Sequence, residues 1–349
     1  MKKKKIIFLY SEVVGYLIPI FKSLVEDYEF EVHVVFWDKN RMKPYKPVGT
    51  KGVFYYPSSN YNRKQILTFC KHISPDIVYV SGWMDKKYLH ATKYLKREGV
   101  PIVTGFDDRW VNSFRQKLGA FLFPFLYKKY FSHAWVAGVE QYEFASRLGF
   151  VKEKIIFDLL SANTEVFDKN KYEEKHLKKK TFLYVGNFRK VKGTDILIEA
   201  YKIYKERFNG DWSLVCVGNG ELDKILKNVK GLKLYPYSNE QELINIALKS
   251  SVFILPSRND QWGVVVHEFA GLGLPLLLSE NVGAKCTFFI NKFNGLLFEN
   301  NSPEELAQKM KEFSQMNYKD LKVMGENSYL LSKRISPQFS VANLMSVLK

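Results

Sequence analysis

Cysteine is scarce in this sequence, and so are the patterns that mark a metal site. The 349 residues include only Cys70, Cys216 and Cys286, and no two of these have the spacing of metal ligands. A sparse and odd set of cysteines suits a reducing compartment. No D-x-D triplet and no cluster of His, Cys and carboxylate residues occurs. We therefore expect no bound metal and no cofactor.

Long hydrophobic runs are also missing. The apolar run at residues 6–10 follows a basic start, but it is too short for a signal peptide, and no small-residue cleavage site follows it. No stretch approaches the roughly eighteen uncharged apolar residues of a membrane-spanning helix. We expect a cytoplasmic protein, and peripheral attachment to the inner face of the plasma membrane stays open.

Acidic residues are outnumbered by basic ones. The 53 Lys and Arg residues against 36 Asp and Glu give a formal net charge of +17, of which residues 1–164 carry roughly +11. Such a surplus suits a polyanionic partner: nucleic acid, an anionic membrane surface or a phosphorylated substrate. No helix-turn-helix, zinc or RNP-like pattern accompanies the charge. We therefore expect no nucleic acid as a partner. Because of the charge, a nucleic-acid-binding protein is kept as the alternative function.

Short apolar runs alternate with helix-like segments along most of the chain, which predicts an α/β fold with parallel sheets. Strands are predicted at residues 6–10, 30–37, 76–80, 100–104, 133–137, 154–157, 182–186, 213–218, 233–235, 252–255, 274–278 and 296–298. The alternation fades between about residues 164 and 180. We predict an N-terminal domain at 1–164, a linker at 165–180, a second domain at 181–330, and a helical segment at 331–349 that packs back on the first domain. Both domains are expected to be doubly wound and Rossmann-like, facing each other across a cleft.

The residues from Pro256 to Glu268 have the pattern of a binding loop. A predicted strand ends at residue 255, a polar loop follows, and Gly263 opens a helix. The free backbone N–H groups at such a helix start suit a phosphate. Asp260 in the loop and Glu268 in the helix can serve two groups of one extended ligand. A capping role for Asp260 and a solvated helix position for Glu268 are the alternative.

A basic loop forms a second pattern. The predicted strand at residues 182–186 is followed by Asn187, Arg189, Lys192 and Gly193, and then by a helix. Cations close to a helix start suit a diphosphate whose negative charge grows during a reaction. A solvated basic turn is the alternative interpretation.

The pattern P-S-x-x-D-x-W-G-V-V-V-x-E-x-x-x-x-G-L-P at residues 256–275 resembles the donor site of retaining glycosyltransferase family 4, the group 1 glycosyltransferases with the GT-B fold. The resemblance covers about residues 182–298. Asp260 stands where that family usually has Glu, and Asn187 stands where it usually has Arg. The resemblance implies a sugar transfer from a nucleotide-sugar, most often a UDP- or GDP-sugar, to a glycan or lipid-linked acceptor, in the synthesis of bacterial surface polysaccharide or glycoconjugates.

The same resemblance implies roles for individual residues. Catalytic roles fall to Asp260, Arg189 and Lys192, with Arg189 in place of the missing Arg. Donor binding falls to Glu268, Gly263, Val264, Val265, Trp262, Tyr237 and Gly15. From their position after a predicted strand of the first domain, Asp107 and Asp108 are candidates for orienting the acceptor, and an exposed capping pair is the alternative. The implied reaction retains configuration and needs no metal. A nucleotide-sugar epimerase or phosphorylase with the same fold is the third hypothesis.

One segment of the first domain is rich in apolar side chains at helical spacing. The recurring residues are Phe114, Leu118, Phe121, Leu122, Phe125 and Leu126; they have basic neighbours, and Pro124 interrupts them. A basic, aromatic helix of this kind suits a membrane interface. A pair of core helices kinked at the proline is the alternative.

Overall fold

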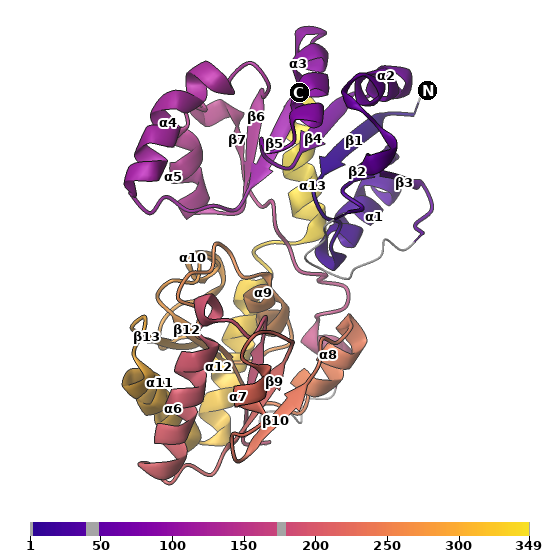
Figure 1. The fold of residues 1–349 in the computed structure, drawn as a ribbon. Helices are drawn as coiled ribbons and strands as arrows, with labels where there is room; N and C mark the ends of the chain where they lie inside the picture. Colours follow the sequence, from indigo (N-terminus) through magenta and orange to yellow (C-terminus); the bar gives the residue numbers. More distant parts are fainter. Residues whose placement is uncertain (1–2, 40–48, 173–178, 349) are drawn as a thin grey trace. The chain divides into compact units, whose positions relative to one another are not determined.

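The computed structural model describes residues 3–39, 49–172 and 179–348 and divides the chain into two compact units (Figure 1). The first unit comprises residues 1–161 and 335–349, and the second comprises residues 162–334. Each unit is built on its own parallel sheet.

Seven parallel strands form the sheet of the first unit, in the order β3-β2-β1-β4-β5-β6-β7. The strands are β1 (Lys5–Tyr10), β2 (Glu31–Phe36), β3 (Val53–Pro57), β4 (Ile77–Val80), β5 (Ile102–Phe106), β6 (His133–Val136) and β7 (Ile155–Ile156). The helices between them are α1 (Ile18–Glu26), α2 (Arg63–Ile73), α3 (Lys86–Arg97), α4 (Phe114–Leu126) and α5 (Val139–Arg147). The order reverses between β1 and β4, which is the switch point of a doubly wound sheet.

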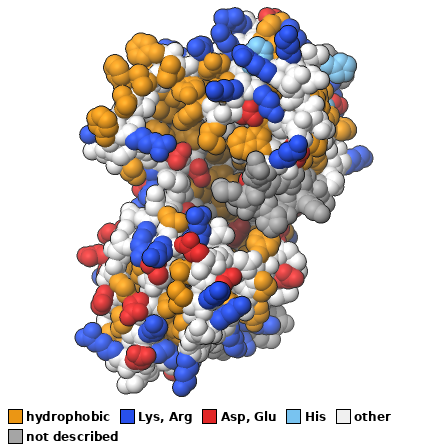
Figure 2. Space-filling model, viewed as in Figure 1, with side chains coloured by type: hydrophobic (Ala, Val, Ile, Leu, Met, Phe, Trp, Pro, Cys, Tyr) orange, Lys and Arg blue, Asp and Glu red, His pale blue; other side chains and the backbone are white. Residues whose placement is uncertain are grey.

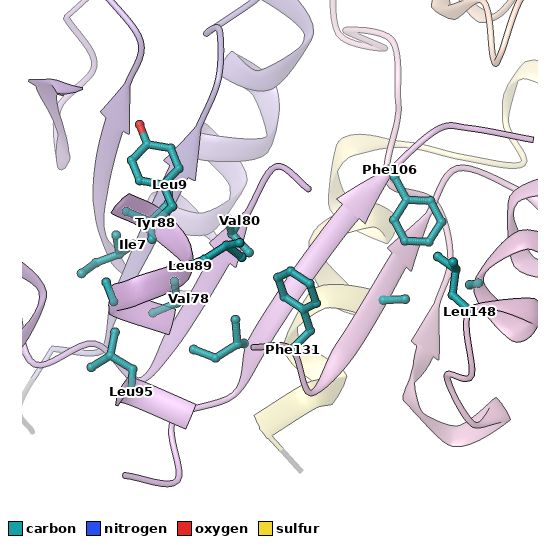
Figure 3. Close-up of a cluster of buried hydrophobic side chains, with 14 of the residues drawn as sticks. Ile7, Leu9, Val78, Val80, Tyr88, Leu89, Leu95, Phe106, Phe131 and Leu148 are labelled. Atoms are coloured by element: carbon teal, nitrogen blue, oxygen red, sulfur yellow. The ribbon is translucent and has the colours of Figure 1, made fainter. Parts of the chain in front are cut away.

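Alternate residues of the strands pack on opposite faces of this sheet. Ile7 and Leu9 of β1, with Val78 and Val80 of β4, belong to a buried cluster that includes Tyr88, Leu89 and Leu95 of α3 (Figure 3). On the other face Phe8 meets Phe21 of α1, with ring centroids 4.9 Å apart. Burial on both faces explains why these strands are continuous apolar runs.

The last helix of the chain, α13 (Pro337–Met345), belongs to the first unit and packs against α1. Ser336 caps its start by accepting from the Phe339 N–H at 3.2 Å. Asn343 donates to the carboxylate of Asp158 at 2.9 Å. The chain therefore crosses between the units twice, once after residue 161 and once after residue 334.

Six parallel strands form the sheet of the second unit, in the order β10-β9-β8-β11-β12-β13. The strands are β8 (Thr181–Val185), β9 (Ser213–Val217), β10 (Leu232–Tyr235), β11 (Val252–Leu255), β12 (Leu276–Ser279) and β13 (Gly295–Phe298). The helices are α6 (Thr194–Glu206), α7 (Asp223–Leu226), α8 (Glu240–Ala247), α9 (Val264–Gly271), α10 (Lys285–Phe288), α11 (Pro303–Gln315) and α12 (Tyr318–Ser332). The switch point lies between β8 and β11.

The segment predicted as a linker, residues 165–180, contacts the second unit through several of its described residues. Phe167 is 2% exposed and packs edge-on against Phe269. Lys169 forms an ion pair with Glu326, and Lys180 one with Asp211. The apolar pattern of the sequence fades here because, among the described residues of this segment, only Phe167 is buried. Residues 173–178 of this predicted linker lie outside the described residues.

Candidate functional site

Loops that follow neighbouring strands of the second sheet meet at its carboxyl edge. The Phe188 N–H, in the loop after β8, donates to the carbonyl of Asn219, after β9, at 3.0 Å. The Asp260 N–H, after β11, donates to the carbonyl of Asn281, after β12, at 3.0 Å. Ligands of doubly wound sheets bind at this edge. Both sequence patterns therefore lie at the same edge of this sheet.

Gly193 brings the loops after β8 and β11 into contact. Its φ is +67°, and a Cβ atom built there would lie 1.8 Å from the carbonyl oxygen of Pro256. No side chain other than hydrogen fits such an approach. The Arg258 N–H donates to the carbonyl of Val191 at 3.0 Å, which fixes the same two loops to each other.

Asp260 and Lys192 form an ion pair across this contact. The Lys192 Nζ lies 2.8 Å from the Asp260 Oδ2, and the Ser257 hydroxyl donates to the same oxygen at 3.1 Å. Asp260 is 7% exposed, whereas the side chain of Lys192 is 30% exposed. The Asp260 carboxylate is thus buried, whereas the Lys192 ammonium that pairs with it is partly exposed to solvent.

Helix α9 begins at this site with donors directed out of its first turn. Its N-cap, Gly263, has a φ of +93°. Val264 and Val265 follow, and the N–H groups of a first turn have no acceptor inside the helix. Together with the helix dipole these groups favour an anion. Glu268 lies one turn later and is half-buried.

Two neighbours of these residues are buried supports. Trp262 is 2% exposed and packs edge-on against Phe288, with ring centroids 6.1 Å apart. The predicted contact of Trp262 with the donor could therefore be made only by its backbone atoms. His267 is fully buried, accepts from the Ala162 N–H at 3.0 Å and donates from Nε2 to the Ser332 carbonyl at 2.9 Å. Burial lowers the pKa of His267 to about 4, against the opposing effect of the Ser332 hydrogen bond. His267 is therefore neutral and structural.

Arg189 and Tyr237 lie on loops at the same edge. Arg189 is exposed at the start of the 3-10 turn η6 (Lys190–Lys192), and its side chain forms no hydrogen bond or ion pair within the described residues. Tyr237 follows β10 and is 62% exposed. Both side chains are accessible to a ligand, and their contacts with a donor stay predictions.

Sequence reasoning missed a second ion pair that holds the site. Arg258 donates from both terminal nitrogens to the carboxylate of Asp195, at 2.5 and 2.9 Å. Burial raises the pKa of Asp195, but the hydrogen bonds and charge of Arg258 outweigh it, and the net pKa is lowered. Arg258 stands inside the recognised pattern, but its partner is 63 residues away, so no local signal pairs them.

The predicted residues of the first unit lie at the carboxyl edge of the other sheet. Gly15 follows β1 and starts the 3-10 turn η1 (Gly15–Leu17). Asp107 and Asp108 follow β5 and are exposed. Partial desolvation raises the pKa of Asp108, against the opposing charge of Arg115. Whether these residues join the site of the second unit stays a prediction.

Neither a group of metal-ligating side chains nor a membrane-spanning helix occurs within the described residues. Within residues 3–39, 49–172 and 179–348, no three His, Cys, Asp or Glu side chains are grouped so that they could hold a metal ion. Over the same ranges, no helix has both the length and the apolar character needed to cross a bilayer.

Comparison with known proteins finds a similarity in the part of the chain that carries the site. Residues 166–331 match the family of glycosyl transferases group 1. This match contains all the loops of the second unit described above. An uncharacterized glycosyltransferase of Methanocaldococcus jannaschii is 31% identical over 172 residues, which are 47% of this chain and 46% of the relative. The chain thus spans about half the length of the curated relatives it matches.

Solved structures extend the similarity of fold to the whole chain. A glycosyltransferase from Rickettsia africae superimposes with a TM-score of 0.76 at 16% identity, covering 100% of this chain and 98% of that one. HepE from Anabaena, crystallised with UDP-glucose, gives a TM-score of 0.73 at 16% identity over 98% and 99% of the two chains. With its two Rossmann-like units on parallel sheets, the chain has the GT-B fold of these glycosyltransferases.

Proposed function

We propose that this chain is a glycosyltransferase that moves a sugar from a UDP- or GDP-sugar to a glycan or lipid-linked acceptor. The observation that supports this most is the Asp260–Lys192 pair at the start of α9, inside the segment that matches the group 1 family. We further propose that transfer retains the configuration of the sugar, needs no metal, and contributes to bacterial surface polysaccharide or glycoconjugate synthesis. The UDP-glucose complex of HepE favours a UDP-sugar as the first donor to test.

The diphosphate of the donor would occupy the start of α9. Val264 and Val265 N–H groups and the helix dipole favour its charge. Lys192, held by Asp260, and the exposed Arg189 supply two cations beside it. When the bond from the sugar to the diphosphate breaks, the electron pair goes to the leaving oxygen. Cations fixed in advance stabilise that charge without reorganising.

The two acids would bind the two ends of the donor. Asp260 commits Oδ2 to Lys192 and Ser257, while Oδ1 accepts no hydrogen bond within the described residues. Oδ1 is the atom that we assign to a hydroxyl of the transferred sugar. Glu268 would accept from the ribose. The acceptor hydroxyl would give its proton to the leaving phosphate as the new bond forms on the face that the phosphate leaves.

Glu268→Ala tests this assignment. We expect it to weaken nucleotide-sugar binding by about 10- to 100-fold, the range for losing hydrogen bonds to a charged group. Binding is measured by calorimetry with UDP-glucose and GDP-mannose, and transfer by nucleotide release with and without acceptor. Glu206→Ala is the matched control, because Glu206 is exposed at the far end of α6.

The outcomes separate the competing functions. Unchanged binding and turnover in Glu268→Ala would remove the donor site from α9. Nucleotide release without any acceptor, together with a changed sugar, would favour an epimerase. A requirement for inorganic phosphate would favour a phosphorylase.

A further inference from the structure

A basic trough runs along one face of α3 in the first unit. It encloses about 860 Å³, and six of its lining residues recur along α3 at the spacing of one helix face: Lys86, Leu89, His90, Lys93, Tyr94 and Arg97. Arg63 of α2 and Lys129 after α4 add cations from its two sides. Among the described residues, no Asp or Glu lines it.

The cations of the trough are not neutralised by the protein. Arg63, Lys86, Lys93, Arg97 and Lys129 form no ion pair with a carboxylate within the described residues. Burial first, and then the charges of Arg63 and Lys93, lower the pKa of His90. An uncompensated field of this kind suits an anionic ligand.

The trough adjoins an exposed apolar ridge on α4. The ridge consists of Phe114, Leu118, Phe121, Leu122, Phe125 and Leu126, each between 38% and 82% exposed. Only Ala120 and Phe123 of this helix are buried. Figure 2 shows hydrophobic side chains gathered in the region of α4. Of the two interpretations of the sequence, the buried helix pair is therefore wrong.

The trough and the ridge are one surface. Leu126 is exposed on α4 and also lines the trough, beside Tyr127 and Tyr130. Lys96 of α3 donates to the carbonyls of Lys128 and Phe131, both at 2.6 Å, and so fixes the end of α4 against α3. Apolar side chains and cations thus have fixed places relative to each other.

We infer that this surface binds an anionic phospholipid bilayer, with lipid phosphate headgroups in the α3 trough and the α4 ridge among the acyl chains. Charge decides between partners. Lys is depleted in protein interfaces, whereas this surface is rich in it, with Lys117, Lys128 and Lys129 exposed beside the ridge. Polybasic segments bind anionic leaflets. Half-buried Trp and Tyr rings, such as Trp83 and Tyr127, suit the headgroup level.

Vesicle co-sedimentation of the full chain tests this inference without any sugar donor. Vesicles of phosphatidylcholine alone are compared with an equal mixture of phosphatidylcholine and phosphatidylglycerol. We expect binding to the mixture at about 0.1 M salt and strong loss at about 1 M, where the Debye length falls from about 10 Å to about 3 Å. Equal binding to both vesicle types would overturn the inference.

Two double variants separate headgroup binding from insertion. Lys86→Gln with Lys93→Gln removes two trough cations, and we expect about 30-fold weaker binding. Its control is Lys224→Gln with Lys227→Gln, two exposed lysines of the second unit. Phe121→Ser with Phe125→Ser should weaken binding by about tenfold or more. Its control is Phe293→Ser with Phe339→Ser, which are also partly exposed.

Three further results would overturn the inference. The first is an equal loss in the trough variant and its control. The second is unchanged vesicle binding in the ridge variant. The third is tighter binding of a labelled RNA or DNA oligonucleotide than of anionic vesicles, lost in the trough variant but not in the ridge variant. That result would assign the surface to nucleic acid. Circular dichroism and thermal unfolding confirm that each variant is folded.

Discussion

Replacing Lys192 by Met isolates the ion pair that joins the two loops of the candidate site. In the folded protein the Asp260 carboxylate is 7% exposed and accepts from the Lys192 Nζ at 2.8 Å and from the Ser257 hydroxyl at 3.1 Å. The variant leaves a buried carboxylate with one neutral donor. Breaking a buried pair typically costs about 3–5 kcal/mol. Because Lys192 is 30% exposed and Ser257 remains, we expect a loss of about 2–4 kcal/mol in the free energy of unfolding.

Lys190→Met is the matched control. Lys190 lies in the same 3-10 turn, is exposed, and its side chain has no partner within the described residues. We expect its stability to change by less than about 0.5 kcal/mol. Urea unfolding followed by circular dichroism gives both values. A double-mutant cycle with Asp260→Asn should give a coupling energy of about 1–3 kcal/mol.

Donor affinity provides an independent measurement of the same pair. Loss of a charged donor to the diphosphate should weaken UDP-glucose binding by about 10- to 100-fold in Lys192→Met, and by little in Lys190→Met. Equal stability of the two lysine variants, or a coupling energy near zero, would refute the reasoning about the pair. Unchanged UDP-glucose affinity with a normal coupling energy would leave the pair structural and refute its place at the diphosphate.

Three further predictions concern residues around the site. Gly193→Ala, with its Cβ 1.8 Å from the Pro256 carbonyl, should lose more than about 2 kcal/mol, whereas Gly99→Ala, also at positive φ but with nothing within 4 Å, should lose only about 1 kcal/mol in thermal or urea unfolding. Burial lowers the pKa of His267 from its ordinary 6.5 to about 4. Between pH 6.5 and pH 4 the unfolded state therefore binds a proton that the folded state does not. The free energy of unfolding should be highest above about pH 6.5 and fall by up to about 3 kcal/mol towards pH 4. Urea unfolding of wild type and His267→Gln across this range checks it, since the variant should lack that part of the slope. Arg258→Lys keeps the charge but loses the two parallel hydrogen bonds to Asp195, and should lower the free energy of unfolding by about 1 kcal/mol. An unchanged midpoint of urea unfolding would contradict the stabilising role of this paired contact.

Most of the second unit could be predicted from sequence because its signals are local. Apart from β10, which contains Lys233 and has no buried residue, its strands are short and mostly apolar runs. The predicted strand at 252–255 coincides with β11. The site pattern, residues 256–268, directly follows that strand. A strand end and a helix start already place Asp260 and the first turn of α9 at one edge of the sheet.

Elements with weak burial patterns were not predicted. Strand β3 lies at the edge of its sheet, and only Val53 of its five residues is buried. Helix α2 buries only Ile66, Cys70 and Ile73, although Asn62 and Gln65 form a capping box that announces its start. Apolar periodicity fails at such surface elements, whereas capping chemistry would have found the helix.

Long-range pairings were beyond the sequence for a different reason. The Lys192–Asp260 pair joins residues 68 positions apart, and its geometry depends on how closely Gly193 approaches Pro256. Nothing in the local pattern of either loop specifies the other. The sequence could therefore name both charged residues as members of one site but could not show that they neutralise each other.

That pairing also connects two features that looked separate in the sequence. Asp260 is one carbon shorter than the Glu that the resemblance leads one to expect, and Asn187 leaves the loop after β8 without the expected Arg. In the structure the short carboxylate is met by Lys192 and Ser257. Asn187 instead contributes its carbonyl, which accepts from the Tyr184 hydroxyl at 3.1 Å and from the Arg189 N–H at 2.9 Å. The Asn187 backbone thus fixes the loop that carries Arg189 and Lys192. Because Asn187→Arg changes an exposed side chain and leaves this backbone carbonyl in place, we expect the substitution to leave the free energy of unfolding unchanged, as measured by urea unfolding.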